Sequence, residues 1–87
     1  MAHGDWLRDR REAAGLTQRQ VADALGWKTS QFISNWERGV SYPPPHRLKD
    51  LAVILKVERT MLEDVIAEAV LLRRQEFFER KVKESLS

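Results

Sequence analysis

Apolar residues along this 87-residue chain recur at intervals of three and four, which is the period of an amphipathic α-helix. No stretch of useful length alternates apolar and polar residues, so no β-strand is predicted. Glycines and a run of three prolines divide the pattern into five helices. The predicted helices cover residues 5–14, residues 18–25, a third segment from Thr29 or Ser30 to Glu37 or Arg38, residues 46–55, and about 25 residues from Thr60 onward.

The ends of these helices carry recognisable signals. Asp5 and Thr17 are suitable N-caps for the first two helices, because their side-chain oxygens can accept backbone N–H groups. Gly15, Gly26 and Gly39 follow the first three helices, where a residue with positive φ commonly ends a helix. The three-proline segment after the third helix is predicted to be a loop, with its last proline in the first turn of the fourth helix.

The most informative stretch is residues 25–39, LGWKTSQFISNWERG. It follows the amphipathic run GLTQRQVADAL after a short turn that contains glycine. A helix, a tight turn and a second helix rich in Gln, Ser and Asn form the shape that enters the major groove of DNA. This arrangement predicts sequence-specific binding of double-stranded DNA, and no nucleophile–base pair or phosphate-binding glycine loop indicates an enzyme.

Helical spacing sorts the third helix into an apolar face and a polar face. Ile33 and Trp36 are expected in the core, and Phe32 flanks them. The helices around them supply further core residues: Val21, Leu25, Leu51 and Leu55. Glu37 adjoins Trp36 at the edge of the core, where an unpaired carboxylate is costly, so a partner is expected, and Arg11 is our choice.

The polar face of the third helix is suited to reading bases. Gln and Asn offer a donor and an acceptor together and can bind adenine through two hydrogen bonds. An ordinary solvated face favours Glu, Lys and Arg, whereas this face carries no acidic residue. The predicted base-contacting residues are Thr29, Ser30, Gln31, Ser34 and Asn35, with Lys28 and Arg38 near the ends.

These residues resemble the Cro- and lambda-repressor-type helix-turn-helix regulators over about residues 5–66. The shared features are Leu7-Arg-x-x-Arg11, Gly15-Leu16-Thr17-Gln18, Val21-Ala22, Leu25-Gly26, Ile33-Ser34, Glu37-Arg38-Gly39, and Pro44-Pro45 followed by Leu48, Leu51-Ala52 and Leu55. The resemblance implies an all-α, compact five-helix domain that usually binds operator DNA as a dimer. It also implies that Arg11 and Glu37 form a structural ion pair between the first and third helices.

The resemblance further implies a set of phosphate contacts. Gln18 matches a residue that contacts phosphate and braces the recognition helix, and Arg38 with the Gly39 backbone matches a phosphate grip. Two departures are visible: the turn before the third helix is one residue longer than usual, and the loop after Gly39 lacks Lys and Arg. Loop contacts are therefore expected from Ser41 and Tyr42. The full set of predicted phosphate-contacting residues is Gln18, Lys28, Arg38, Gly39, Ser41, Tyr42 and Arg47, with Lys49 beyond.

Charge and composition narrow the partners. Residues 1–57 carry nine basic and six acidic residues, whereas residues 58–87 carry six basic and seven acidic residues, so the front part suits a polyanion. The chain has no cysteine and only two distant histidines, so no metal site or cofactor is predicted. No apolar run approaches the ~20 residues of a membrane span, and the N-terminus lacks the apolar core of a signal peptide. A cytoplasmic protein of a prokaryote or phage is expected.

The C-terminal segment stays apolar beyond the expected domain core. We divide the chain into a DNA-binding domain, residues 1–66, and a helical extension, residues 67–87. The extension carries a stripe that predicts a homodimer placing two recognition helices on a palindromic operator, about 34 Å apart. Folding back onto the domain is the alternative. The predicted dimer contacts are Leu71, Phe77, Phe78 and Val82.

Together these features predict a sequence-specific transcriptional regulator, most simply a repressor that occupies an operator. A second hypothesis is an antitoxin or adaptor whose C-terminal helix binds another protein, with DNA binding kept for autoregulation. The sequence leaves open the operator, the regulated genes, repression against activation, and the controlling signal.

Overall fold

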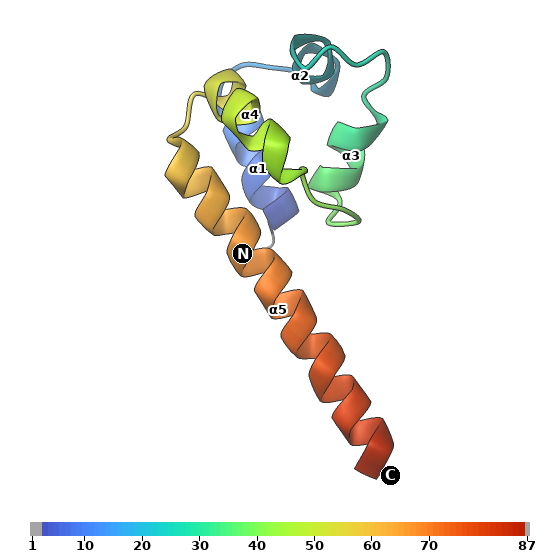
Figure 1. Cartoon of the computed structure of the whole chain (residues 1–87). Coiled ribbons are helices and arrows are strands. Elements are labelled where there is room, and N and C mark those ends of the chain that lie inside the picture. The colour runs from blue at the N-terminus through green and yellow to red at the C-terminus, as the bar shows by residue number, and fades with distance from the viewer. Residues whose placement is uncertain (1–2, 87) are drawn as a thin grey trace.

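The computed structural model describes residues 3–86, which form an all-α structure of five α-helices (Figure 1). No strand occurs within this described range. The all-α, five-helix prediction is therefore confirmed. The elements are α1 (His3–Ala13), α2 (Gln18–Ala24), α3 (Gln31–Glu37), the 3-10 helix η1 (Pro45–Arg47), α4 (Leu48–Leu55) and α5 (Arg59–Leu86).

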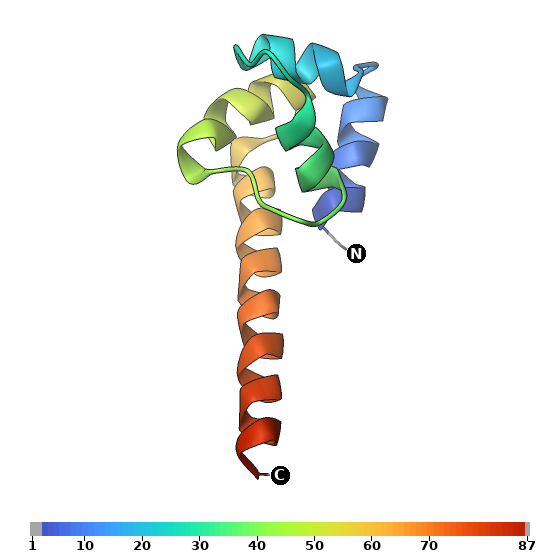
Figure 2. The same ribbon diagram turned by 90° about the vertical axis from the view of Figure 1, so that its right-hand side faces the viewer.

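The helices form a compact head with one long projection. Helices α1 to α4 and the start of α5 pack together, and the rest of α5 extends away as a single straight rod (Figures 1 and 2). The molecule is accordingly elongated, with extents of 48 × 25 × 22 Å. We call the head the part formed by residues 3–70 and the tail the part of α5 from Leu71 to Leu86.

The core of the head lies where α3, α4 and the start of α5 meet α1 and α2. Removing these apolar side chains from water is the main force that holds such a small domain together. The six core residues predicted in the second, third and fourth helices are all buried. Of the residues that the spacing predicts for the core in the last helix, Leu62 and Ile66 are buried, whereas Met61 is 49% exposed. The buried apolar set is Leu7, Val21, Ala22, Leu25, Ile33, Trp36, Leu48, Leu51, Ala52, Leu55, Leu62 and Ile66.

Local signals set most helix ends as predicted. Thr17 and Gln20 form a reciprocal capping box at the start of α2: the Gln20 N–H donates to Thr17 Oγ1 at 3.1 Å, and the Thr17 N–H donates to Gln20 Oε1 at 2.8 Å. Gly15, Gly26 and Gly39 all have φ between +75° and +81° after their helices.

Two boundaries differ from the prediction. Helix α1 already includes His3, so Asp5 lies within its first turn, where its carboxylate accepts a hydrogen bond from Arg8 at 3.1 Å instead of capping the helix. The predicted fourth helix opens as the 3-10 turn η1 and becomes α-helical only at Leu48. Pro45 disfavours α geometry in the residue before it, and Pro44 is extended, so the helical turn cannot begin before Pro45.

The tail is exposed along its whole length. Leu62 and Ile66 are the last buried residues of α5, Val70 packs at the edge of the core, and every residue from Leu71 to Leu86 is exposed. The tail thus leaves the head and does not fold back on it (Figure 2). None of the helices described is both long enough and apolar enough to cross a membrane.

Candidate nucleic-acid interface

Helix α3 is fixed to the head through its apolar side. Ile33 and Trp36 are each 3% exposed and belong to the core cluster. On the same side, Gly4 of α1 lies directly against the C-terminal carbonyl groups of α3. A Cβ added at Gly4 would lie 2.3 Å from the Glu37 oxygen, so only glycine permits this approach. The position and tilt of α3 are therefore set by close packing against α1.

An ion pair adds a polar link between α1 and α3. Arg11 donates from Nε to Glu37 Oε2 at 2.7 Å and from Nη2 to Glu37 Oε1 at 3.0 Å. A third Arg11 bond, from Nη1 to the Leu16 carbonyl at 2.8 Å, holds the guanidinium in place. Glu37 is 6% exposed, and its hydrogen bonds raise the pKa of Arg11 above the ordinary value of arginine.

Gln18 joins this ion pair from the start of α2. Its Nε2 donates to Glu37 Oε1 at 3.2 Å, so Glu37 accepts hydrogen bonds from both α1 and α2. The three residues Arg11, Gln18 and Glu37 thus connect the first three helices. The Gln18 bond itself ties the start of α2 to the end of α3.

The solvent side of α3 presents a row of three polar side chains, Gln31, Asn35 and Arg38, which we call the outer row. Gln31 Nε2 donates to Asn35 Oδ1 at 3.0 Å, and Arg38 Nη2 donates to the same oxygen at 2.7 Å. Residues at this spacing lie on one face of a helix. The outer row therefore presents two amides and one guanidinium along a single line. Amides can hydrogen-bond base edges, and a guanidinium can bind a base edge or a phosphate.

The remaining predicted base contacts lie around the first turn of α3. Ser30 occupies the N-cap position but makes no side-chain cap bond, whereas Thr29 Oγ1 accepts the Gln31 N–H at 3.2 Å. The longer turn thus places the capping oxygen one residue earlier. Thr29 is exposed, while Ser30 and Ser34 are half-buried beside the outer row.

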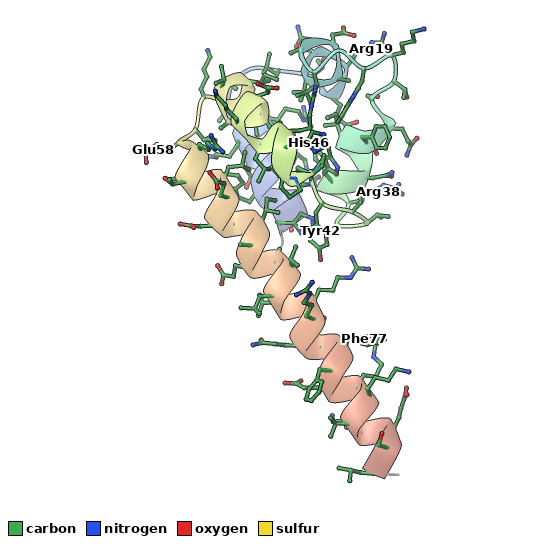
Figure 3. All side chains as sticks on the ribbon, in the orientation of Figure 1. Arg19, Arg38, Tyr42, His46, Glu58 and Phe77 are labelled. Atoms are coloured by element: carbon green, nitrogen blue, oxygen red, sulfur yellow. The ribbon has the colours of Figure 1, made fainter. Side chains whose placement is uncertain are left out.

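Cationic side chains gather on the same side of the head. Arg19 and Arg38 point outward from the side that α5 does not cover (Figure 3). Lys28 is exposed, and its carbonyl accepts a hydrogen bond from Arg19 at 2.6 Å, which ties α2 to the turn before α3. Arg19 is partly neutralised by Asp23 at 3.2 Å, so Lys28 and Arg38 are the less compensated charges of this surface.

The loop after α3 does not bring all its predicted phosphate contacts to this surface. His3 Nε2 donates to the Ser41 carbonyl at 3.0 Å, and the His3 ring packs on Tyr42 with centroids 4.6 Å apart. Arg73 of α5 lies 5.8 Å from the Tyr42 ring centroid. These contacts place the Tyr42 ring between α1 and α5, apart from the outer row.

Arg47 is also occupied within the head. Its Nη2 donates to the Leu25 carbonyl, and its guanidinium lies 5.3 Å from the centre of the Trp27 ring. Both contacts tie η1 to the end of α2. The structure therefore does not bring Arg47 to the outer row, whereas Arg38 belongs to that row and Gly39 follows Arg38 directly in the chain.

Sequence reasoning did not identify His3 and Gly4, which hold the end of α3 and the following loop. A glycine near the start of a predicted helix is a weak signal on its own, because the carbonyl groups that it approaches lie more than thirty residues away. Among the residues that the structure describes, no group of three or more His, Cys, Asp or Glu side chains could hold a metal ion.

Comparison with known proteins agrees with this geometry. A family model described as helix-turn-helix matches residues 7–62. The chain is also similar to the crystal structure of the clp gene regulator ClgR from Corynebacterium glutamicum. The two share 25% identity with a TM-score of 0.62, and the match covers 94% of this chain and 87% of that chain. No curated protein matches the chain significantly.

Proposed function

This chain belongs to the Cro/C1-type helix-turn-helix family and is a DNA-binding transcriptional regulator, and from that premise we propose that it reads one DNA sequence through α3. The observation that carries the proposal is the outer row. Its two amides and one guanidinium stand on a helix that the core, Gly4 and the Arg11–Glu37 pair hold rigidly. Rigid placement matters because side chains that are already in position lose less conformational freedom when they bind DNA.

In this mechanism, Gln31 and Asn35 exchange their mutual hydrogen bond for bonds to base edges. An amide can satisfy adenine N6 and N7 together, so the proposed site contains adenines in the major groove. Thr29, Ser30 and Ser34 make the shorter contacts around them. Because Asn35 Oδ1 already accepts two protein donors, DNA binding trades bonds and leaves few polar groups unpaired.

Phosphate contacts fix the register of α3 on the duplex. We propose Lys28, Arg38 and the Gly39 backbone as the main phosphate contacts, because Lys28 and Arg38 are exposed cations before and at the end of α3. Gln18 and Ser41 are proposed as further phosphate contacts. Such contacts position the protein but carry no sequence information of their own.

The exposed tail supports a homodimer. Leu71, Phe77, Phe78 and Val82 are between 39% and 68% exposed on a helix that leaves the head. We propose that two tails cover these side chains, so that two heads bind a palindromic operator and repress by occupying it. The same exposed side chains support a second candidate, a protein partner on the tail, which co-purification of a different chain would reveal.

The proposal is tested by selecting preferred sequences from a random duplex library and measuring Kd on a selected site and on a scrambled duplex. Gln31→Ala and Asn35→Ala should each weaken the selected site by about 1–3 kcal/mol and leave the scrambled duplex unchanged. Val53→Ala, an exposed apolar change on α4, is the matched control and should change neither. Equal binding of wild-type protein to selected and scrambled duplexes would overturn base reading.

A further inference from the structure

Phe32 is an exposed aromatic residue on the recognition helix. Its side chain is 51% exposed, although the rest of the solvent side of α3 is polar. A large apolar group left in water on a small protein is informative when it adjoins a functional surface. The core does not need Phe32, because Ile33 and Trp36 already fill the apolar side of the helix.

The Phe32 ring packs on a series of other aromatic rings. It packs on Trp27 with centroids 5.0 Å apart, and Trp27 packs edge-on against Trp36 at 5.5 Å. Trp36 is buried, and Arg47 lies against the Trp27 ring at 5.3 Å. A stack of rings therefore runs from the core to the surface, and it holds Phe32 outward in one place.

Phe32 also lies beside one of the proposed base-reading amides and next to the other in the chain. It precedes Asn35 by three residues, a spacing at which two side chains are neighbours on a helix, and it follows Gln31 directly. It belongs to the first turn of α3, and the N-terminal residues of a recognition helix are those that contact base edges in the major groove.

From this placement we infer that Phe32 reads the C5-methyl group of a thymine in the operator. The thymine methyl is the apolar feature that the major groove presents, and apolar side chains contact it. Gln31 suits an adjacent adenine, so the centre of each half-site should be rich in A·T pairs. The inference rests on the proposed function, because it assigns one more contact to the same surface.

The test replaces thymine by uracil, which removes only the methyl group, at each position of a selected site. For wild-type protein, one such replacement should weaken binding about fourfold, the equivalent of about 0.8 kcal/mol for one buried methyl group at 1.4 kcal/mol per factor of ten. For Phe32→Ala, the thymine site and the uracil site should bind equally. Phe32→Leu should keep part of the methyl preference, because leucine is still apolar.

Two results would overturn the inference. One is Phe32→Ala binding that is weakened but remains as sensitive to uracil as wild type, which would assign Phe32 a structural role or a contact with protein. The other is a wild-type protein that distinguishes selected from scrambled DNA yet tolerates uracil at every position. The proposed function fails in a separate way, by the absence of any sequence preference, so the two failures are distinguishable. Thermal unfolding of both variants, measured by circular dichroism, shows that each is folded.

Discussion

The guanidinium of Arg11 and the carboxylate of Glu37 form a two-bond pair that joins α1 to the end of the recognition helix. The pair lies almost out of water, with side chains that are 12% and 5% exposed. Taking both charges out of water has a cost, and the pair is favourable only because each hydrogen-bonding group is satisfied. Its role is therefore to fix how α3 is presented, and its loss should affect stability and DNA binding together.

Breaking this pair should be costly. We expect Arg11→Ala to lower the free energy of unfolding by about 3–5 kcal/mol, because it leaves Glu37 buried without its main partner. The exposed pair Arg8–Asp5, at 3.1 Å, is the matched control, and Arg8→Ala should cost less than about 1 kcal/mol. Urea unfolding of the two variants gives the comparison, and equal losses would contradict the assigned role.

The pH dependence of this pair follows from the raised pKa of Arg11. A base whose pKa is higher in the folded state stabilises the fold fully below its unfolded pKa and loses that contribution as the pH rises through the folded value. For Arg11 that window lies in strongly alkaline solution. Replacing Arg11 should therefore lower stability by the same amount at pH 6 and at pH 9, as urea unfolding at both values would show.

A methyl group at Gly4 should displace the recognition helix. The added Cβ would lie 2.3 Å from the Glu37 oxygen and 2.8 Å from the Trp36 oxygen, and both are backbone atoms that move only with α3. We expect Gly4→Ala to lower the free energy of unfolding by about 1–3 kcal/mol. Under conditions in which the variant is fully folded, its DNA affinity should still be lower than that of wild type. Gly15→Ala is the control. Its positive φ should lower stability, but the space around Gly15 is open, so the added Cβ displaces no helix. The DNA affinity of the folded Gly15→Ala variant should therefore be unchanged.

Much of the head was predictable because its signals are local. The three-and-four spacing placed Ile33 and Trp36 in the core, and the Thr17 capping box and the glycine stops set the helix ends. That Glu37 needs a cationic partner followed from one physical rule, because an unpaired carboxylate at the edge of a core is costly. That the partner is Arg11 is what the family resemblance implied, and the structure shows this pair.

The features that could not be predicted from the sequence depend on contacts between residues far apart in the chain. Nothing near His3 in the sequence indicates that its ring binds the Ser41 carbonyl and packs on Tyr42. Arg47 likewise looks like a free cation until the fold brings it against Trp27. Phe32 was placed at the edge of the core by its spacing, and only its exposure shows that it faces solvent.

The salt dependence of DNA binding should separate Arg38 from Arg47. Each phosphate contact contributes about 0.9 to the slope of log Kd against log salt concentration. We expect Arg38→Ala to reduce that slope by about this amount, because Arg38 is exposed at the end of the outer row, where its side chain donates to the neutral Asn35 amide. Arg47→Ala should leave the slope unchanged and lower the unfolding midpoint, since Arg47 ties η1 to the Leu25 carbonyl. The opposite pattern would place Arg47 at the DNA backbone.

The tail should control assembly independently of the fold of the head. Phe78→Ala removes a ring that is 68% exposed and makes no contact with the buried core of the head. If two tails pair, this change should weaken dimerisation at least tenfold, since central aromatic residues of an interface commonly contribute about 2 kcal/mol or more. Sedimentation at micromolar concentration measures the shift, and Val53→Ala on α4 controls for the loss of exposed apolar surface elsewhere.

The same variant shows whether pairing stabilises the protein. Dimerisation makes the unfolding midpoint rise with protein concentration, because association favours the folded state by mass action. That rise should be present in wild type and in Val53→Ala and reduced in Phe78→Ala. A wild-type protein that stays monomeric, with a midpoint independent of concentration, would contradict the homodimer. Its exposed tail residues would then have to be covered by a different protein, and one chain would bind a single half-site.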